Sequence, residues 1–259
     1  MADILKQHLI ELYNKETRLD GRKFDEYRKI EIEYGVSSKS AEGSARVKLG
    51  STEVIAGIKL EVTKPYPDTP SEGTIMVNVE LLPLSSPDFE SGPPGIDSIE
   101  LSRVVDRVIR EGHCLDFKKL CIREGELMWI VVIDIYPINN AGNLFDAAAL
   151  AALAAIKDAR FPELKEDKIN YKVRTDKKLP IKTWPVSCTI LRTGNKLVLD
   201  PLPEEEKMSD ARLTIGVLED GELCALQKGG DQGLSSEDIE NMLDIAIKKT
   251  KELRKVLEK

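Results

Sequence analysis

Residues 136–147, YPINNAGNLFDA, place a turn of small residues directly before a helix-forming run of alanine and leucine. Gly142, Asn143 and Leu144 stand where the turn gives way to the helix. Backbone N–H groups at a helix N-terminus lack partners and carry a partial positive charge, so such turns often hold a phosphate. The turn is therefore a candidate phosphate loop, and a tight structural turn is the alternative.

A second candidate is a row of arginines in the segment 99–112, IELSRVVDRVIREG. At about 100° per residue along a helix, Arg103, Arg107 and Arg110 share one narrow face, opposite an apolar stripe. A guanidinium can grip two phosphate oxygens at once, so this face suits a phosphate backbone. A solvated face with weak ion pairs is the simpler interpretation if nothing else is known.

Carboxylates and a basic loop offer further chemistry. Asp200, Asp210 and the run 204–206, three glutamates, could handle a proton or a metal ion. Near the loop 62–73, VTKPYPDTPSEG, two lysines stand close to Tyr66, which could stack on a base. A solvent loop stiffened by its prolines is the simpler interpretation of that segment. The lysines are Lys59 and Lys64.

Composition restricts the class of protein. The 259 residues are 41% hydrophobic and 32% charged, with a net charge of −7, so any RNA site must be a local basic patch. The four cysteines are scattered and only His8 and His113 could assist them, so neither a metal site, a disulfide framework nor a cofactor is indicated. No apolar run approaches the roughly 18 residues of a membrane span, and we expect a cytoplasmic protein.

The elements that must position these residues fall into two similar series. An amphipathic helix opens the chain, and the following segments have the alternation of antiparallel strands. The arginine helix should begin at an N-cap, Asp97 or Ser98, and the strand 127–138 is apolar enough to be buried on both faces. Strands at 29–36, 44–64 and 74–84 precede that helix.

The pattern starts again at about residue 165, with further strands and a long closing helix at 235–259. Mixed sheets need helices to cover their apolar faces, so two α+β halves in one domain are the simplest architecture. We expect a single domain over residues 1–259, with halves at about 20–164 and 165–259.

Taken in order, these segments resemble the RNase PH family, and most closely its non-catalytic branch in the ring of the archaeal exosome. The resemblance covers nearly the whole chain, and the order of its motifs makes chance similarity improbable. The motifs are RLDGR, EGSARVKLGSTEVIAGI, EGTIMVNVELLPLSSP, IELSRVVDRVIRE, IYPINNAGNLFDAAALAAL, LDPLPEEE and ARLTIGVLEDGELCALQKGG.

The resemblance implies the RNase PH fold, two βαβα-type halves similar to the second domain of ribosomal protein S5. It also implies a hexameric ring around an RNA channel, in which this chain alternates with a catalytic RNase PH-like subunit beneath an RNA-binding cap protein. Active members shorten single-stranded RNA from its 3′ end with inorganic phosphate and release nucleoside diphosphates. In this family the helix at 99–112 faces the channel, so Arg103, Arg107 and Arg110 are expected to contact RNA.

The sequence departs from the active members at the phosphate site. Their loop glycine is followed by Ser or Thr and then Arg, whereas Gly142 is followed by Asn143 and Leu144. Leu144 cannot make a charge-assisted bond to phosphate. A second family arginine falls near Asp97, which would repel phosphate. The resemblance therefore implies a degenerate phosphate loop and no catalytic residue.

Two other functions remain open on the sequence. An aspartate at the start of one strand is retained as Asp210, so a self-sufficient phosphorolytic 3′-to-5′ exoribonuclease that uses Asp210 is the main alternative. A small-molecule kinase shares the S5-like topology, but it needs a serine-rich nucleotide loop that NNAGNLFD lacks. A ring subunit that is inert alone and contacts RNA beside a catalytic partner is the favoured interpretation.

Overall fold

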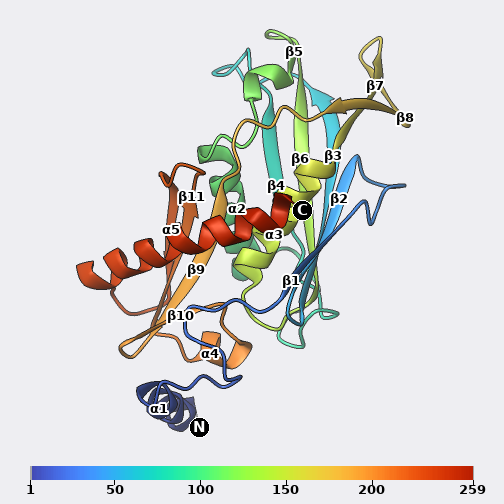
Figure 1. Ribbon diagram of the computed structural model, residues 1–259. Coiled ribbons are helices and arrows are strands. Elements are labelled where there is room, and N and C mark those ends of the chain that lie inside the picture. The colour runs from blue at the N-terminus through green and yellow to red at the C-terminus, as the bar shows by residue number, and fades with distance from the viewer. Residues whose placement is uncertain (1, 259) are drawn as a thin grey trace.

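One buried helix lies between two β-sheets in the computed structural model, which describes residues 2–258 (Figure 1). This helix, α3 (Leu144–Asp158), contacts β2 and β3 of one sheet and β9 of the other. The chain is a mixed α/β protein, as the sequence predicts.

The first sheet has six strands, and its order differs from a simple antiparallel run. The strand β6 (Leu127–Asn139) lies between β3 (Thr52–Thr63) and β4 (Thr74–Val79), and it is parallel to β4. The prediction of antiparallel strands was wrong there, because the helix α2 (Ile96–Glu111) supplies the long crossover that a parallel pair needs. The sheet is completed by β1 (Ile30–Tyr34), β2 (Gly43–Leu49) and β5 (Cys121–Arg123), the last preceded by the 3₁₀ turn η1 (Phe117–Leu120).

The prediction that this central strand is buried on both faces was also wrong. The inward side chains of β6, such as Val131 and Ile133, are fully buried, whereas Ile130 and Val132 on the other face are only half-buried. Helices of this chain cover one face of the sheet, so the central position of β6 does not bury its outer side chains.

The second sheet has four antiparallel strands and carries the closing helix. Its order is β10 (Lys196–Leu199), β9 (Val186–Thr193), β11 (Ala211–Val217) and β12 (Leu223–Gly229). The predicted closing helix is confirmed as α5 (Ser236–Glu258), which buries Met242 and Ala246 against this sheet. A hairpin of β7 (Arg160–Lys165) and β8 (Lys168–Lys178) joins the two sheets, and α4 (Pro203–Lys207) follows β10.

The N-terminus of α2 differs from the sequence-based prediction. The helix α2 begins after Gly95, which makes no side-chain cap bond, and Ser98 lies inside the first turn, where its hydroxyl donates to the carbonyl of Val79. The predicted N-cap at Asp97 or Ser98 was therefore wrong, because the Ser98 hydroxyl ties the helix to β4.

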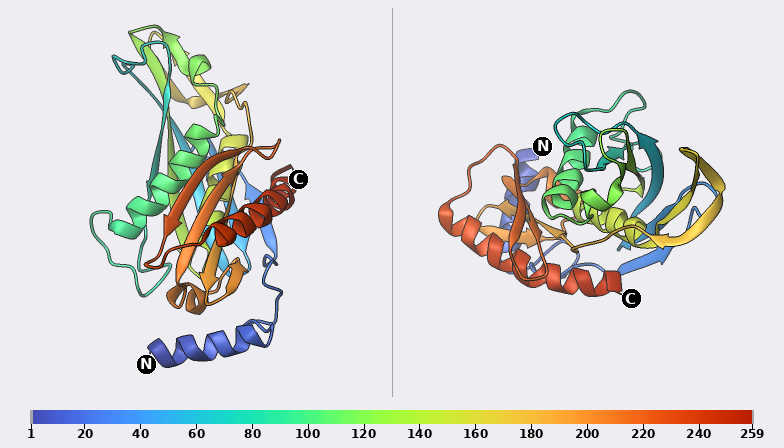
Figure 2. Two further views of the ribbon diagram at one scale, coloured as in Figure 1. Left: turned by 90° about the vertical axis from the view of Figure 1, so that its left-hand side faces the viewer. Right: turned by 90° about the horizontal axis from the view of Figure 1, so that it is seen from above.

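The opening helix α1 (Ala2–Asn14) lies at one end of the molecule, where Leu9 is buried while Ile4 stays 71% exposed (Figure 2).

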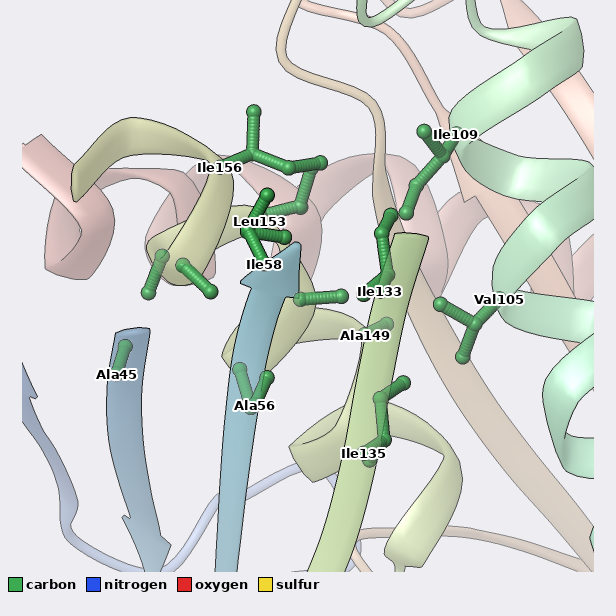
Figure 3. Packing of buried hydrophobic residues seen from close by; sticks show 14 of the residues in the cluster. Ala45, Ala56, Ile58, Val105, Ile109, Ile133, Ile135, Ala149, Leu153 and Ile156 are labelled. Carbon is green, nitrogen blue, oxygen red and sulfur yellow. The ribbon is translucent and has the colours of Figure 1, made fainter. Parts of the chain in front are cut away.

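The alanine-rich composition of α3 is explained by how closely this helix packs against the sheet. Figure 3 shows Ala149, Leu153 and Ile156 of α3 packed with side chains of the strands and of α2. The backbone of β2 comes so close to the end of α3 that a Cβ on Gly43 would lie 2.5 Å from the Ala155 carbonyl oxygen. No helix among residues 2–258 is long and apolar enough to cross a membrane.

The close approach at Gly43 predicts a large difference between two glycines of the same sheet. We expect Gly43→Ala to lower the free energy of unfolding by about 1–3 kcal/mol, since backbone atoms must move to admit the methyl group. Gly57→Ala is the control, because its Cβ would make an ordinary 3.6 Å contact with the Cβ of Ala41. Denaturant unfolding measures both, and equal losses would contradict the packing argument.

Candidate functional site: a carboxyl-filled phosphate loop and an arginine face

The candidate phosphate loop is held tightly against the segment that follows β10. Gly142 has φ +87°, and a Cβ there would lie 2.2 Å from the carbonyl oxygen of Pro201. Asn143 caps α3 in the left-handed conformation, with φ +57°, and its side chain is fully buried. Only glycine adopts the positive φ of position 142 without steric cost, and asparagine tolerates the left-handed conformation of position 143.

The side chain of Asn143 points inward, away from any ligand. Its Nδ2 donates to Asp146 at 3.0 Å and to Asp200 at 3.1 Å. The loop carbonyls are also engaged, because Arg28 donates to the carbonyl oxygens of Ala141 at 2.6 Å and Gly142 at 3.0 Å. The amide that replaces the hydroxyl of active relatives is thus part of the structure of the turn.

One backbone N–H at the start of the helix, that of Asn143, already has an acidic partner. The N–H of Asn143 donates to Oε1 of Glu206, at 2.8 Å. Burial raises the pKa of Glu206 to about 7, while the bond from Asn143 and the charges of Arg212 and Arg28 oppose that rise. A carboxyl group of the chain itself is therefore bonded to a backbone N–H of the candidate phosphate loop.

The cavity beside this carboxyl group has the wrong charge for phosphate. It holds about 380 Å³, and Leu144 lies on its wall. Its one basic residue, Arg212, is paired with Glu100 and lies over the ring of Phe145, 3.9 Å from the ring centroid. Four carboxyl groups line the cavity: Asp97, Glu100, Glu206 and Asp231.

Asp210 lies apart from this cavity. Its carboxylate pairs with Lys6 of α1 at 2.5 Å and accepts the N–H of Gly194 at 2.7 Å. Partial burial raises the pKa of Asp210, but the bonds from Lys6 and Gly194 outweigh it and hold the pKa below its usual range. Asp210 is therefore a salt-bridged residue that links α1 to the second sheet, and it does not line the cavity.

The structural role of the residues that hold the loop in place was not predicted from the sequence. Asp200 is fully buried and accepts bonds from Arg22, Arg28 and Asn143. Arg18 is also fully buried, and it forms a two-point ion pair with Glu205 at 2.6 and 3.0 Å. The only signal was the density of arginine in RLDGR and the residues after it, which predicts a turn and says nothing about burial.

The arginine face of α2 divides into a free part and a structural part. Arg103 is exposed and has no hydrogen-bond or ion-pair partner within residues 2–258, and Arg107 is exposed and bonded only to Gln227 at 3.0 Å. Arg110 makes a two-point pair with Asp106 at 2.8 and 3.0 Å and donates to the carbonyl of Ile75 at 3.0 Å. Arg110 therefore clamps α2 to β4, and Arg103 and Arg107 are free to bind a ligand.

The raised pKa of Glu206 predicts a pH dependence of stability. The folded protein holds a proton on Glu206 between pH 4.5, the usual pKa, and about 7, whereas the unfolded chain has lost it. The free energy of unfolding should therefore fall as the pH rises through this window, by on the order of 1–3 kcal/mol. Asp146, whose pKa burial raises from 3.8 to about 6, adds to the fall at lower pH.

The test uses two neighbouring glutamates. Glu206→Gln should flatten the upper part of the profile, and Glu204→Gln, at an exposed position, should leave it unchanged. Unfolding curves from pH 5 to pH 8 measure the difference. Parallel profiles for all three proteins would contradict the assignment to Glu206.

Comparison with known proteins agrees with this architecture. Residues 26–162 match the model of the 3′ exoribonuclease family, domain 1, and residues 183–249 match that of domain 2. The exosome complex component Rrp42 of Methanothermobacter thermautotrophicus is 46% identical over 261 residues, which cover 100% of this chain and 96% of that protein. The protein of the same name from Archaeoglobus fulgidus is 46% identical, over 98% of this chain and 96% of its own length.

Solved structures give the same result. A chain of the Archaeoglobus fulgidus exosome with RNA bound to the active site superposes with a TM-score of 0.91, at 46% identity and 98% coverage of both chains. A chain of an archaeal exosome core gives a TM-score of 0.88 at 41% identity, over 100% of this chain and 98% of that one. From its sequence relatives and its fold together, the chain belongs to the RNase PH family of 3′ exoribonucleases.

Proposed function

We propose that this chain is a non-catalytic ring subunit of an archaeal exosome, which contacts RNA and supports 3′-to-5′ phosphorolytic degradation by a catalytic RNase PH-like partner. In this proposal the two subunits alternate in a hexameric ring around a channel for single-stranded RNA, and an RNA-binding cap protein covers one end. The names of the relatives, an exosome component, an exosome with RNA bound to the active site and an archaeal exosome core, support the assembly.

The bond from the Asn143 N–H to Glu206 is the observation that carries the non-catalytic role. Phosphorolysis needs donors that bind the attacking phosphate and stabilise the charge of its transition state. Here the N–H is bonded to a carboxyl group, the Asn143 side chain is buried, and Leu144 has no donor. The acidic cavity wall adds repulsion, so the loop offers no side-chain donor and the cavity has an unfavourable charge for phosphate.

The free arginines of α2 support the contact with RNA. Arg103 and Arg107 lie on a groove between α2 and β4, on the exposed side of the helix. In a chain of net charge −7, two unpaired arginines on one helix face provide a local site for a phosphate backbone. The structural bonds of Arg110 make it a support for this face instead of a third phosphate contact.

A self-sufficient exoribonuclease that uses Asp210 is not favoured. The Asp210 carboxylate is paired with Lys6, and the cavity at the loop is lined by other residues. The Asp210 carboxylate is thus engaged by a salt bridge and does not line the cavity.

The first prediction from this proposed function concerns the isolated chain. We expect no release of nucleoside diphosphate from single-stranded RNA at any phosphate concentration, since the missing donors cost several kcal/mol of transition-state stabilisation, a rate loss of about a thousandfold or more. Addition of the catalytic subunit from the same organism should start the reaction. Phosphate-dependent shortening of RNA by the pure chain alone would show that the proposal is wrong.

The second prediction concerns Arg103 and Arg107 in the assembled ring. Changing both to Ala should weaken RNA binding for every base sequence, because phosphate contacts carry no base information. The log–log dependence of affinity on salt should become shallower by roughly 0.7 for each phosphate of the single strand that no longer meets an arginine. Stability should change by less than about 0.5 kcal/mol, since both side chains are exposed.

A double variant of Lys248 and Lys251 is the matched control, because it removes two exposed charges from α5 that lack carboxylate partners within the described residues. Equal salt slopes for the arginine and lysine variants would mean that the arginine face is only solvated.

A further inference from the structure

The hairpin of β7 and β8 carries a concentration of positive charge that the channel helix does not explain. Residues 160–182 contain eight lysines and arginines against four acidic residues, in a chain whose net charge is −7. The hairpin projects from the upper right of the molecule in Figure 1, and both Figures 1 and 2 separate it from α2. It is therefore a second basic surface, in a different place from Arg103 and Arg107.

Two of the four acidic residues of this surface are paired, and the basic residues of β8 have no carboxylate partners among residues 2–258. Glu163 pairs with Lys165 at 2.9 Å, and Asp167 makes a two-point pair with Arg123 at 2.6 and 2.9 Å. None of the five cations of β8 has a carboxylate oxygen within 4.0 Å among residues 2–258, and all five are exposed. These cations are Lys168, Lys172, Arg174, Lys177 and Lys178.

An aromatic ring stands among these cations on a strand that bows outward. Asn170 and Arg174 pair with two adjacent residues of β7, so the three residues between them bulge away from the ladder. Tyr171 lies in this bulge, is 51% exposed, and donates to the carbonyl of Leu60 at 3.3 Å. Nζ of Lys59 lies over the ring, 4.4 Å from its centroid. The ring is thus anchored at its hydroxyl while much of its surface faces solvent.

We propose that β8 is a second binding surface for single-stranded RNA, where Lys168, Lys172 and Lys178 contact phosphates and a base stacks on Tyr171. The inference rests on the proposed RNA-contacting function and adds a surface to it. Alternation of cations with an exposed aromatic ring is the pattern of proteins that bind single strands without base preference.

An acidic protein segment is the competing occupant, and the shape of the strand argues against it. A protein strand would add to β8 through a regular row of backbone N–H and C=O groups, and lysines and bulges are the features that block such pairing. Single-stranded RNA needs no regular edge, because its phosphates and bases contact side chains. The bulge at Tyr171 hinders strand addition and exposes the ring for stacking.

The test measures binding of a fluorescent oligoadenylate to the full-length chain over a range of salt concentrations. The triple variant Lys168→Ala, Lys172→Ala, Lys178→Ala should bind at least tenfold more weakly, with a salt slope shallower by about 2, from roughly 0.7 per phosphate. The matched control is Lys248→Ala, Lys251→Ala, Lys255→Ala, which removes the same charge from exposed positions of α5 and should leave both quantities unchanged.

Two variants of Tyr171 distinguish stacking of a base on the ring from general electrostatic attraction of RNA. Tyr171→Ala should weaken binding roughly tenfold, whereas Tyr171→Phe, which keeps the ring, should bind as the wild type does. Equal losses for the two triple variants, or no loss in Tyr171→Ala, would overturn the inference. Competition by polyglutamate as strong as that by unlabelled RNA would also overturn it, in favour of an acidic partner.

A parallel measurement on Arg103→Ala, Arg107→Ala distinguishes this inference from the proposed function. If only the arginine variant weakens binding, the β8 surface is refuted and the α2 contact stands. If only the β8 variants weaken it, the α2 contact is refuted and the β8 surface stands.

Discussion

The buried carboxylate of Asp200 is the constraint on which the rest of the site depends. It is fully buried, and it accepts bonds from the backbone N–H, Nε and Nη2 of Arg28 at 2.7–2.8 Å, from Arg22 at 2.9 Å and from Asn143 at 3.1 Å. Arg28 in turn bonds the carbonyls of Ala141 and Gly142. One carboxylate therefore fixes the N-terminal segment, the loop before α3 and the end of β10 together. Removal of one partner from such a buried network leaves an uncompensated charge, which typically costs about 3–5 kcal/mol.

The same network determines what the loop can do. The loop keeps the glycine turn and the helix N-terminus that suit an anion, but its amide and carbonyl groups are bonded within the chain. Glu206 accepts the N–H of Asn143, and Lys6 pairs with the carboxylate of Asp210. Several polar groups of the loop are thus engaged inside the fold. Preorganised donors are the main source of catalysis in phosphoryl transfer, and here they stabilise the turn.

The proposed RNA contacts lie on two surfaces of the chain. The arginine face of α2 and the strand β8 are separate basic regions on an acidic chain, and each has cations without acidic partners among residues 2–258. Net negative charge suppresses unspecific attraction to nucleic acid, so the proposed RNA contacts depend on these local patches.

The sequence by itself determined the family, the alanine-rich helix and the loss of Ser/Thr and Arg after Gly142, because motif order and residue type are local properties. It also placed three arginines on one face of α2, since helical spacing fixes direction. It could not predict that β6 lies between β3 and β4, or that Arg110 donates to the carbonyl of Ile75 on β4, because both depend on contacts between distant segments. The glutamates at 204–206 make the same point. Glu204 is exposed, Glu205 is buried in an ion pair with Arg18, and Glu206 accepts a hydrogen bond from the N–H of Asn143. Identical neighbours in a row differ only in what the fold brings against them, and that was decided by the tertiary structure.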